Sequence, residues 1–85
     1  AAALDDIDDR LDDLQVRLNR AIAAAATTGG ATYVDTWSAS AGRDACAPPD
    51  RRWVEPMVGA RTRTTVHPNA AGQRGIADAV AAALR

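Results

Sequence analysis

The apolar residues of the first 27 positions recur at steps of three or four, and this spacing constrains the fold more than any other feature. They are Leu4, Ile7, Leu11, Leu14, Leu18, Ile22 and Ala25. Such positions share one face of a helix, so the spacing predicts an amphipathic helix over about residues 4–27. Gly29 and Gly30 follow, and glycine is the usual left-handed residue just past a helix end.

The polar face of this predicted helix is acidic at its start. Aspartate occupies positions 5, 6, 8, 9, 12 and 13, whereas Arg17 and Arg20 lie nearer the other end, which complements the helix dipole. Two further interpretations stay open. A calcium site would need a turn that wraps oxygens around the ion, which a regular helix does not provide. A coiled-coil partner helix would suit the leucine spacing, although three heptads are a short run.

Residues 31–35 (Ala-Thr-Tyr-Val-Asp) are nearly all apolar or β-branched, which is typical of a short buried parallel strand. A helix, a glycine turn and a strand form half of a βαβ unit, so the expected class is α/β. Asp35 would lie at the carboxyl end of the strand, where such sheets place their sites, although a loop-capping role is simpler. A long loop over about 36–68 and a closing helix over about 69–84 are expected to follow.

Composition excludes several functions. The chain has 85 residues and a net charge of −1, which gives no strong field for nucleic acid or an anionic membrane. No apolar run reaches the about 20 residues of a membrane span, and Ala1-Ala2-Ala3 does not begin a signal peptide. With one histidine and one cysteine, no metal site or cofactor is expected. Alanine supplies much of the apolar fraction, so we expect a weakly stabilised core.

The single histidine, His67, stands at a predicted turn. Pro68 biases it away from helical geometry, and Asn69 is a good N-cap for the helix that follows. Such turns commonly present functional groups. A lone histidine in a small domain is more often a surface or structural residue, so the surrounding pattern has to decide.

That pattern, His-Pro-Asn-x-x-Gly, resembles the C-terminal block of the SGNH, or GDSL, esterase and lipase family, and other blocks extend the resemblance to its secreted actinobacterial members. In chain order the blocks are Leu14–Ile22, Tyr33–Asp35, Ala41–Cys46, Arg52–Val54 and His67–Gln73. The resemblance implies that residues 1–85 are the C-terminal segment of a three-layer α/β/α domain with a parallel sheet. It also implies secretion, an ester or lipid substrate, and an acyl-enzyme mechanism in which His67 is the general base for a serine.

The chain departs from the family pattern at the residue that orients the base. Most members have an aspartate three residues before the histidine, where this chain has Thr64. Some members use a main-chain carbonyl, so Thr64 is expected to orient His67 through its carbonyl oxygen in a Ser–His dyad. Asp44 and Asp50 are alternatives that could reach His67 through the loop.

The nucleophile and the oxyanion hole of the family are absent from these 85 residues. Ser38 and Ser40 lack the glycine-flanked turn of a nucleophile, and no motif supports a Cys46–His67 pair. We therefore expect this chain alone to be inactive and to work with the upstream half of the same domain. The resemblance further implies that Cys46 forms a disulfide with a cysteine upstream of Ala1.

Two assignments remain open at this stage. Trp37 and Trp53 are expected either to line the cleft of the enzyme or to act as packing anchors. The alternative function is a non-catalytic interaction module, in which the acidic amphipathic helix docks on a partner. It rests on the leucine spacing and on the missing nucleophile.

Overall fold

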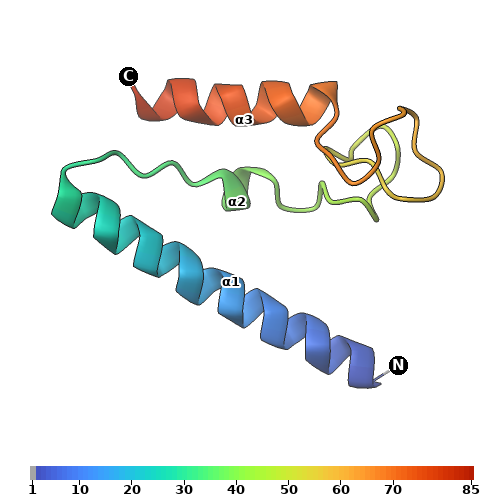
Figure 1. Ribbon diagram of the computed structural model, residues 1–85, viewed down its shortest axis with the longest axis horizontal. Coiled ribbons are helices and arrows are strands. Elements are labelled where there is room, and N and C mark those ends of the chain that lie inside the picture. Colours follow the sequence, from blue (N-terminus) through green and yellow to red (C-terminus); the bar gives the residue numbers. More distant parts are fainter. Residues whose placement is uncertain (1) are drawn as a thin grey trace. The chain divides into compact units, whose positions relative to one another are not determined.

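The computed structural model describes residues 2–85, with side chains from Asp6 onward. Leu4, expected on the apolar face of the first helix, and Asp5, expected on its polar face, lie outside the described side chains. Three helices follow one another: α1 (Ala2–Gly29), α2 (Thr36–Ala39) and α3 (Ala70–Ala83) (Figure 1). The chain forms two compact units, one ending at Tyr33 and the other running from Val34 to Arg85.

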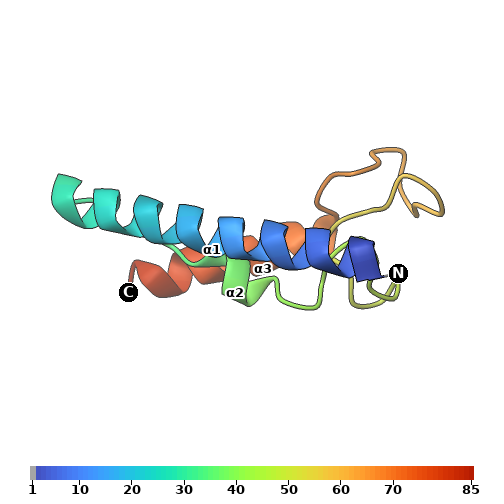
Figure 2. The ribbon, with the colours of Figure 1, turned by 90° about the horizontal axis from the view of Figure 1, so that it is seen from below.

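Helix α1 extends two residues beyond each end of the expected range and is unbroken in both views (Figures 1 and 2). Exposed ion pairs join Asp6 to Arg10 at 3.2 Å and Asp13 to Arg17 at 3.9 Å. Each contributes a few tenths of a kcal/mol, about 0.3–0.5 at the helix i,i+4 spacing. None of the described helices is long and apolar enough to cross a membrane.

The apolar face of α1 is exposed along its length. Its residues Ile7, Leu11, Leu14, Leu18 and Ile22 have exposed fractions between 48% and 60%. We call these five residues the apolar stripe of α1. The helix therefore forms from local periodicity and propensity, with its apolar face left unburied in this structure.

The end of α1 is closed by main-chain hydrogen bonds. Gly30 has φ +75°, its N–H donates to Thr27 O at 3.3 Å, and the N–H of Ala31 donates to Ala26 O at 2.8 Å. This double pattern is a Schellman motif, which satisfies carbonyl groups that the last helical turn leaves free.

The expected α/β class with a parallel sheet is wrong for the part of the chain that the structure describes, which is helical and contains no strand. Residues 31–35 lie between α1 and α2 without strand pairing. A strand needs a neighbouring strand to bond its N–H and C=O groups, whereas here the N–H of Thr36 donates to Val34 O at 3.1 Å. Asp35, with φ −82° and ψ 84°, lies close to an inverse γ-turn, so the chain turns at once.

Asp35 has a capping role. Its carboxylate accepts a hydrogen bond from the N–H of Ser38 at 2.9 Å, which makes it the N-cap of the short helix α2. Hydrogen bonding from the side chain and then the main chain of Ser38 lowers the pKa of Asp35. The one-turn helix α2 lies at the start of the stretch expected to be a long loop, and it contacts α3.

Between α2 and α3 the chain forms an excursion beyond the N-terminal end of α3 (Figures 1 and 2). Its two ends run antiparallel, with an isolated bridge between Val54 and Pro68. The N–H of Asn69 donates to Trp53 O at 2.8 Å, and the N–H of Glu55 donates to His67 O at 3.0 Å. We call residues 52–69 the His67 loop.

Helix α3 begins at its N-cap, Asn69, whose side chain accepts from the N–H of Gly72 at 2.9 Å. Gly72 and Gly75 lie against Trp53: a Cβ atom on Gly72 would overlap the Trp53 carbonyl, and one on Gly75 would overlap the Trp53 ring. Glycine is unfavourable inside a helix, and here the close approach of Trp53 requires it, through the main chain at Gly72 and through the indole at Gly75.

The buried side chains of the described chain are charged rather than apolar. No hydrophobic side chain is buried among them, whereas Arg52 and Glu55 have exposed fractions of 6% and 2%. The second unit is therefore organised around an ion pair and around Trp53 against α3.

Candidate functional site

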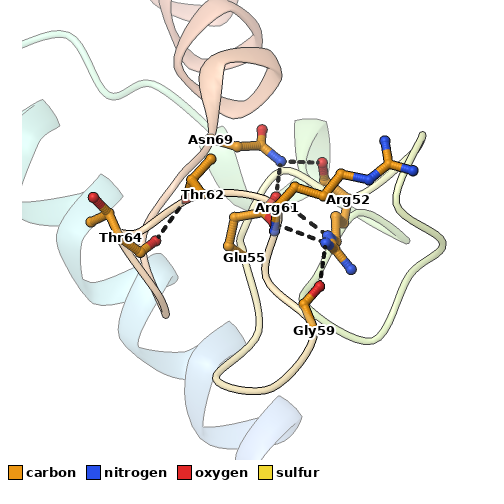
Figure 3. Close-up of polar contacts among 7 residues, drawn as sticks. All are labelled: Arg52, Glu55, Gly59, Arg61, Thr62, Thr64 and Asn69. Carbon is orange, nitrogen blue, oxygen red and sulfur yellow. Dashed lines mark hydrogen bonds and ion pairs between the residues drawn. The ribbon is translucent and has the colours of Figure 1, made fainter.

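The buried centre of the His67 loop is an ion pair. Arg52 Nη2 donates to Glu55 Oε1 at 2.8 Å, and Arg52 Nε donates to Glu55 Oε2 at 3.3 Å. The same Nη2 also donates to Gly59 O at 3.1 Å (Figure 3). A planar guanidinium fits a carboxylate through two such bonds, which fixes geometry as well as charge.

Two further donors complete the shell of the Glu55 carboxylate. The N–H of Arg61 donates to Oε1 and the Asn69 side-chain amide donates to Oε2, both at 2.8 Å (Figure 3). Hydrogen bonds from Arg52, then Asn69, then the Arg61 main chain lower the pKa of Glu55 from 4.5 to about 2, although burial acts in the opposite direction. The carboxylate is therefore ionised at neutral pH.

Asn69 joins this cluster to α3. Its amide nitrogen donates to Arg52 O at 2.8 Å as well as to Glu55, and its amide oxygen accepts from Gly72 N. One side chain thus caps the helix and holds the loop that precedes it.

The main chain at Val66 is strained. Val66 has φ +57°, a left-handed conformation that a β-branched residue rarely adopts. Its N–H donates to Glu55 O at 2.7 Å. Strained residues cluster at functional sites, where the surrounding structure has to hold them in place.

The ring of His67 is held by a main-chain carbonyl. His67 Nδ1 lies 2.7 Å from Thr65 O, and the residue is exposed. A carbonyl oxygen can only accept, so this bond requires the proton on Nδ1 and leaves the lone pair of the neutral ring on Nε2. That tautomer is the one a general base needs.

Thr64, the residue expected to supply this carbonyl, is bonded elsewhere. Its carbonyl oxygen accepts from the Thr62 hydroxyl at 3.3 Å (Figure 3). The carbonyl at the His67 ring is that of the next residue, because the left-handed turn at Val66 separates Thr65 from His67.

The other residues that the sequence offered as partners of His67 contact groups other than His67. The Ser40 hydroxyl donates to Trp37 O at 2.9 Å, and Asp44 Oδ1 accepts from Cys46 N at 2.9 Å. Cys46 is exposed and unpaired within the described residues. In the part of the chain that the structure describes, no hydrogen bond joins Ser38, Ser40, Cys46, Asp44 or Asp50 to His67.

The two tryptophans differ. Trp53 is a packing anchor, since its ring lies against α3 and the Arg43 guanidinium stands 5.2 Å from the ring centroid. Trp37 on α2 has an exposed fraction of 43%. Among the described residues, no group of three or more His, Cys, Asp or Glu side chains is placed to hold a metal ion.

Sequence reasoning missed Arg52 and Glu55 as site residues. They are three residues apart in a segment without helical periodicity, so their spacing gave no signal. The sequence signal that was available is the pair of opposite charges, Arg52 and Glu55, on either side of Trp53-Val54.

With this geometry described, the sequence can be compared with those of known proteins. The chain is 46% identical over 65 residues to Lipase 2 of Streptomyces coelicolor. The match covers 76% of this chain and 22% of that lipase, so the chain spans about a fifth of its relative's length. This relates the chain to a lipase or esterase-type hydrolase. No family model matches the chain, and no solved structure matches it.

Proposed function

We propose that this chain is the base-bearing part of a serine ester hydrolase and that His67 is its general base. The observation that carries the proposal is the 2.7 Å contact between His67 Nδ1 and Thr65 O, which assigns the lone pair to Nε2. The similarity to a lipase supports the same class.

In the proposed reaction, Nε2 of His67 takes the proton of a serine hydroxyl while the serine oxygen attacks the ester carbonyl. The proton then passes to the leaving alcohol, and an acyl-enzyme forms. Water attacks the acyl-enzyme with the same nitrogen as base, which releases the acid and frees the serine. A neutral carbonyl orients the ring in place of a carboxylate, so the mechanism is a Ser–His dyad.

The serine and the oxyanion hole belong, in this proposal, to a part of the protein outside these 85 residues, so the chain alone is inactive. We assign the protein to the SGNH or GDSL family on the ordered blocks described above. The orienting carbonyl, expected at Thr64, is assigned to Thr65 on its hydrogen bond to the ring.

We also propose that the protein is secreted and that Cys46 pairs with a cysteine elsewhere in it. The exposure of Cys46 supports the disulfide, since an exposed thiol is accessible to a partner cysteine. Its substrates are proposed to be carboxylic esters or lipids.

The test uses the longest natural protein that carries this chain and a short-chain chromogenic ester. His67→Ala should lower kcat by about 10³-fold or more, since a general base supplies roughly 10²–10⁴ alone and acts with the nucleophile as a unit. His67→Asn is the matched control: its amide N–H can still donate to Thr65 O, but it cannot accept the serine proton. Equal losses of kcat in both variants support the role of His67 as a general base. Retention of activity in His67→Asn contradicts that role.

A second function is favoured by the exposed apolar stripe of α1. We propose, as the alternative, a non-catalytic module that docks through this face. The coding sequence upstream of Ala1 separates the two functions. A Gly-Asp-Ser-like block and a second cysteine there favour the hydrolase, and their absence favours the module.

A further inference from the structure

We propose that Glu55 is a positioning residue for His67: its buried carboxylate anchors the main chain at Glu55, which bonds to Val66 and His67 and so holds the histidine ring against Thr65 O. The proposal rests on the proposed function of His67 as a base. Glu55 acts through the main chain and is not the acid of a triad, because its two oxygens are bonded to Arg52, Arg61 and Asn69.

The first step of the argument is the main-chain contact. Glu55 N donates to His67 O at 3.0 Å, and Glu55 O accepts from Val66 N at 2.7 Å. One residue thus holds both Val66 and His67. No other residue of the described chain bonds to both of them.

The second step is how firmly Glu55 is held. Its exposed fraction is 2%, and its carboxylate receives four N–H groups, two from Arg52 and one each from Arg61 and Asn69. A buried charge is tolerated only when its hydrogen bonds are complete, so the side chain has a single favourable placement. Through Asn69 this placement is also tied to the start of α3.

The third step is the strain at Val66. Val66 stands between Thr65 and His67 in the chain and has φ +57°. Its conformation therefore decides whether His67 Nδ1 can reach Thr65 O. A β-branched residue leaves the left-handed region when nothing holds it there. The bond from Val66 N to the anchored Glu55 main chain supplies that restraint.

The test changes which side-chain atoms at positions 55 and 69 donate and accept hydrogen bonds, without changing the size of the side chains. In Glu55→Gln the new amide nitrogen faces N–H groups of Asn69 or Arg52 and cannot accept from them, so the side chain is no longer held in place. In the double variant Glu55→Gln/Asn69→Asp, the new carboxylate can accept from the new amide, and aspartate is as good an N-cap as asparagine. The bond from the Asn69 amide to Arg52 O is lost in this variant, so the expected recovery is partial. Asp44→Asn is the control, because Asp44 is a carboxylate of the same unit that bonds to Cys46 N and not to the His67 loop.

Two readouts are measured in the longest natural protein that carries this chain. The first is ester hydrolysis: Glu55→Gln should lower kcat by about 10–100-fold with KM within about twofold, as expected of a misplaced catalytic group. The second is the ring Nδ1–H proton of His67 in protein labelled with ¹⁵N-histidine, assigned by its loss in His67→Asn. This signal should disappear through exchange in Glu55→Gln and persist in Asp44→Asn.

Partial recovery of kcat and of the ring proton in the double variant supports the proposal. Wild-type kcat and an intact ring proton in Glu55→Gln would overturn it. So would a loss of kcat that accompanies unfolding seen by circular dichroism, with the ring proton intact below the unfolding transition. If the wild-type protein hydrolyses no ester, the proposed function fails, and the ring-proton signal alone still decides whether Glu55 positions His67.

Discussion

Arg52 and Glu55 face each other across two hydrogen bonds, of 2.8 Å and 3.3 Å, in a loop where neither belongs to a helix. Their pairing replaces the apolar core that the described part of the second unit lacks. Removing one partner leaves a buried charge without compensation, so Arg52→Ala should destabilise the second unit by about 3 kcal/mol or more. Chemical denaturation measures the loss. An effect within about 0.5 kcal/mol, the size expected of an exposed pair, would contradict this role.

The same pair predicts a dependence on acid. The pKa of Glu55 is lowered from 4.5 to about 2 in the folded chain, so ionised Glu55 favours the folded state. Its contribution to stability is complete above the unfolded pKa of 4.5 and is lost as the pH falls through about 2. Denaturation of wild type and Glu55→Gln between pH 6 and pH 2 tests this: the difference between them should shrink as the pH falls. Asp13→Asn, at an exposed pair, is the control and should track wild type. A constant difference for Glu55→Gln would refute the pKa argument.

The contact between Trp53 and α3 predicts an unusual response to alanine. Ala is favoured over Gly in a helix by about 1 kcal/mol, but a Cβ on Gly75 would overlap the Trp53 ring. Overpacking typically costs about 1–3 kcal/mol, so Gly75→Ala should destabilise the protein. Trp53→Leu should remove most of that penalty in the double variant. Additive effects of the two changes would show that the ring does not lie against Gly75.

Local signals in the sequence located α1 and α3 but missed α2 and could not give the fold class. The recurring apolar residues of α1, the glycines at its end and Asn69 at the start of α3 each act through neighbours within a turn, so a sequence pattern can reveal them. The strand expected at 31–35 depended on a pairing partner that the described chain does not provide, and an Asp35 that caps α2 turns the chain instead.

In the candidate site, too, local features could be predicted from the sequence and contacts between distant residues could not. His67 could be found from its motif, because Pro68 and Asn69 fix the local geometry around it. The choice of Thr65 over Thr64 as its carbonyl partner depends on the left-handed φ of Val66, which the residue type argues against. The bond between Glu55 and Asn69 joins residues 14 positions apart, and no periodic pattern marks such a contact.

The two glycines at the end of α1 form a matched pair for a further test. Gly30 has φ +75°, whereas Gly29 lies within the helix and a Cβ there meets nothing within 4 Å. Gly30→Ala should cost roughly 1–2 kcal/mol of helix stability, and Gly29→Ala should be neutral or stabilising by up to about 1 kcal/mol. Backbone chemical shifts of residues 22–29 report the change. Equal effects at both positions would contradict the Schellman geometry.

The proposed disulfide predicts how Cys46 reacts. In the 85-residue chain the exposed thiol should alkylate readily, whereas in the longest natural protein it should alkylate only after reduction. Peptide mass spectrometry without reduction identifies the partner cysteine. Rapid alkylation of Cys46 in the unreduced natural protein would show that the thiol is free there.

Labelling with a fluorophosphonate probe tests the central claim most directly, because the probe modifies only a serine that a base has activated. It is applied to the longest natural protein that carries this chain, as wild type, His67→Ala and His67→Asn. The proposed mechanism predicts a single labelled serine outside residues 1–85 in the wild type, and labelling slowed by about 10³-fold or more in both variants. Wild-type labelling rates in the variants, or no labelling of the wild type, would contradict the assignment of His67 as the general base.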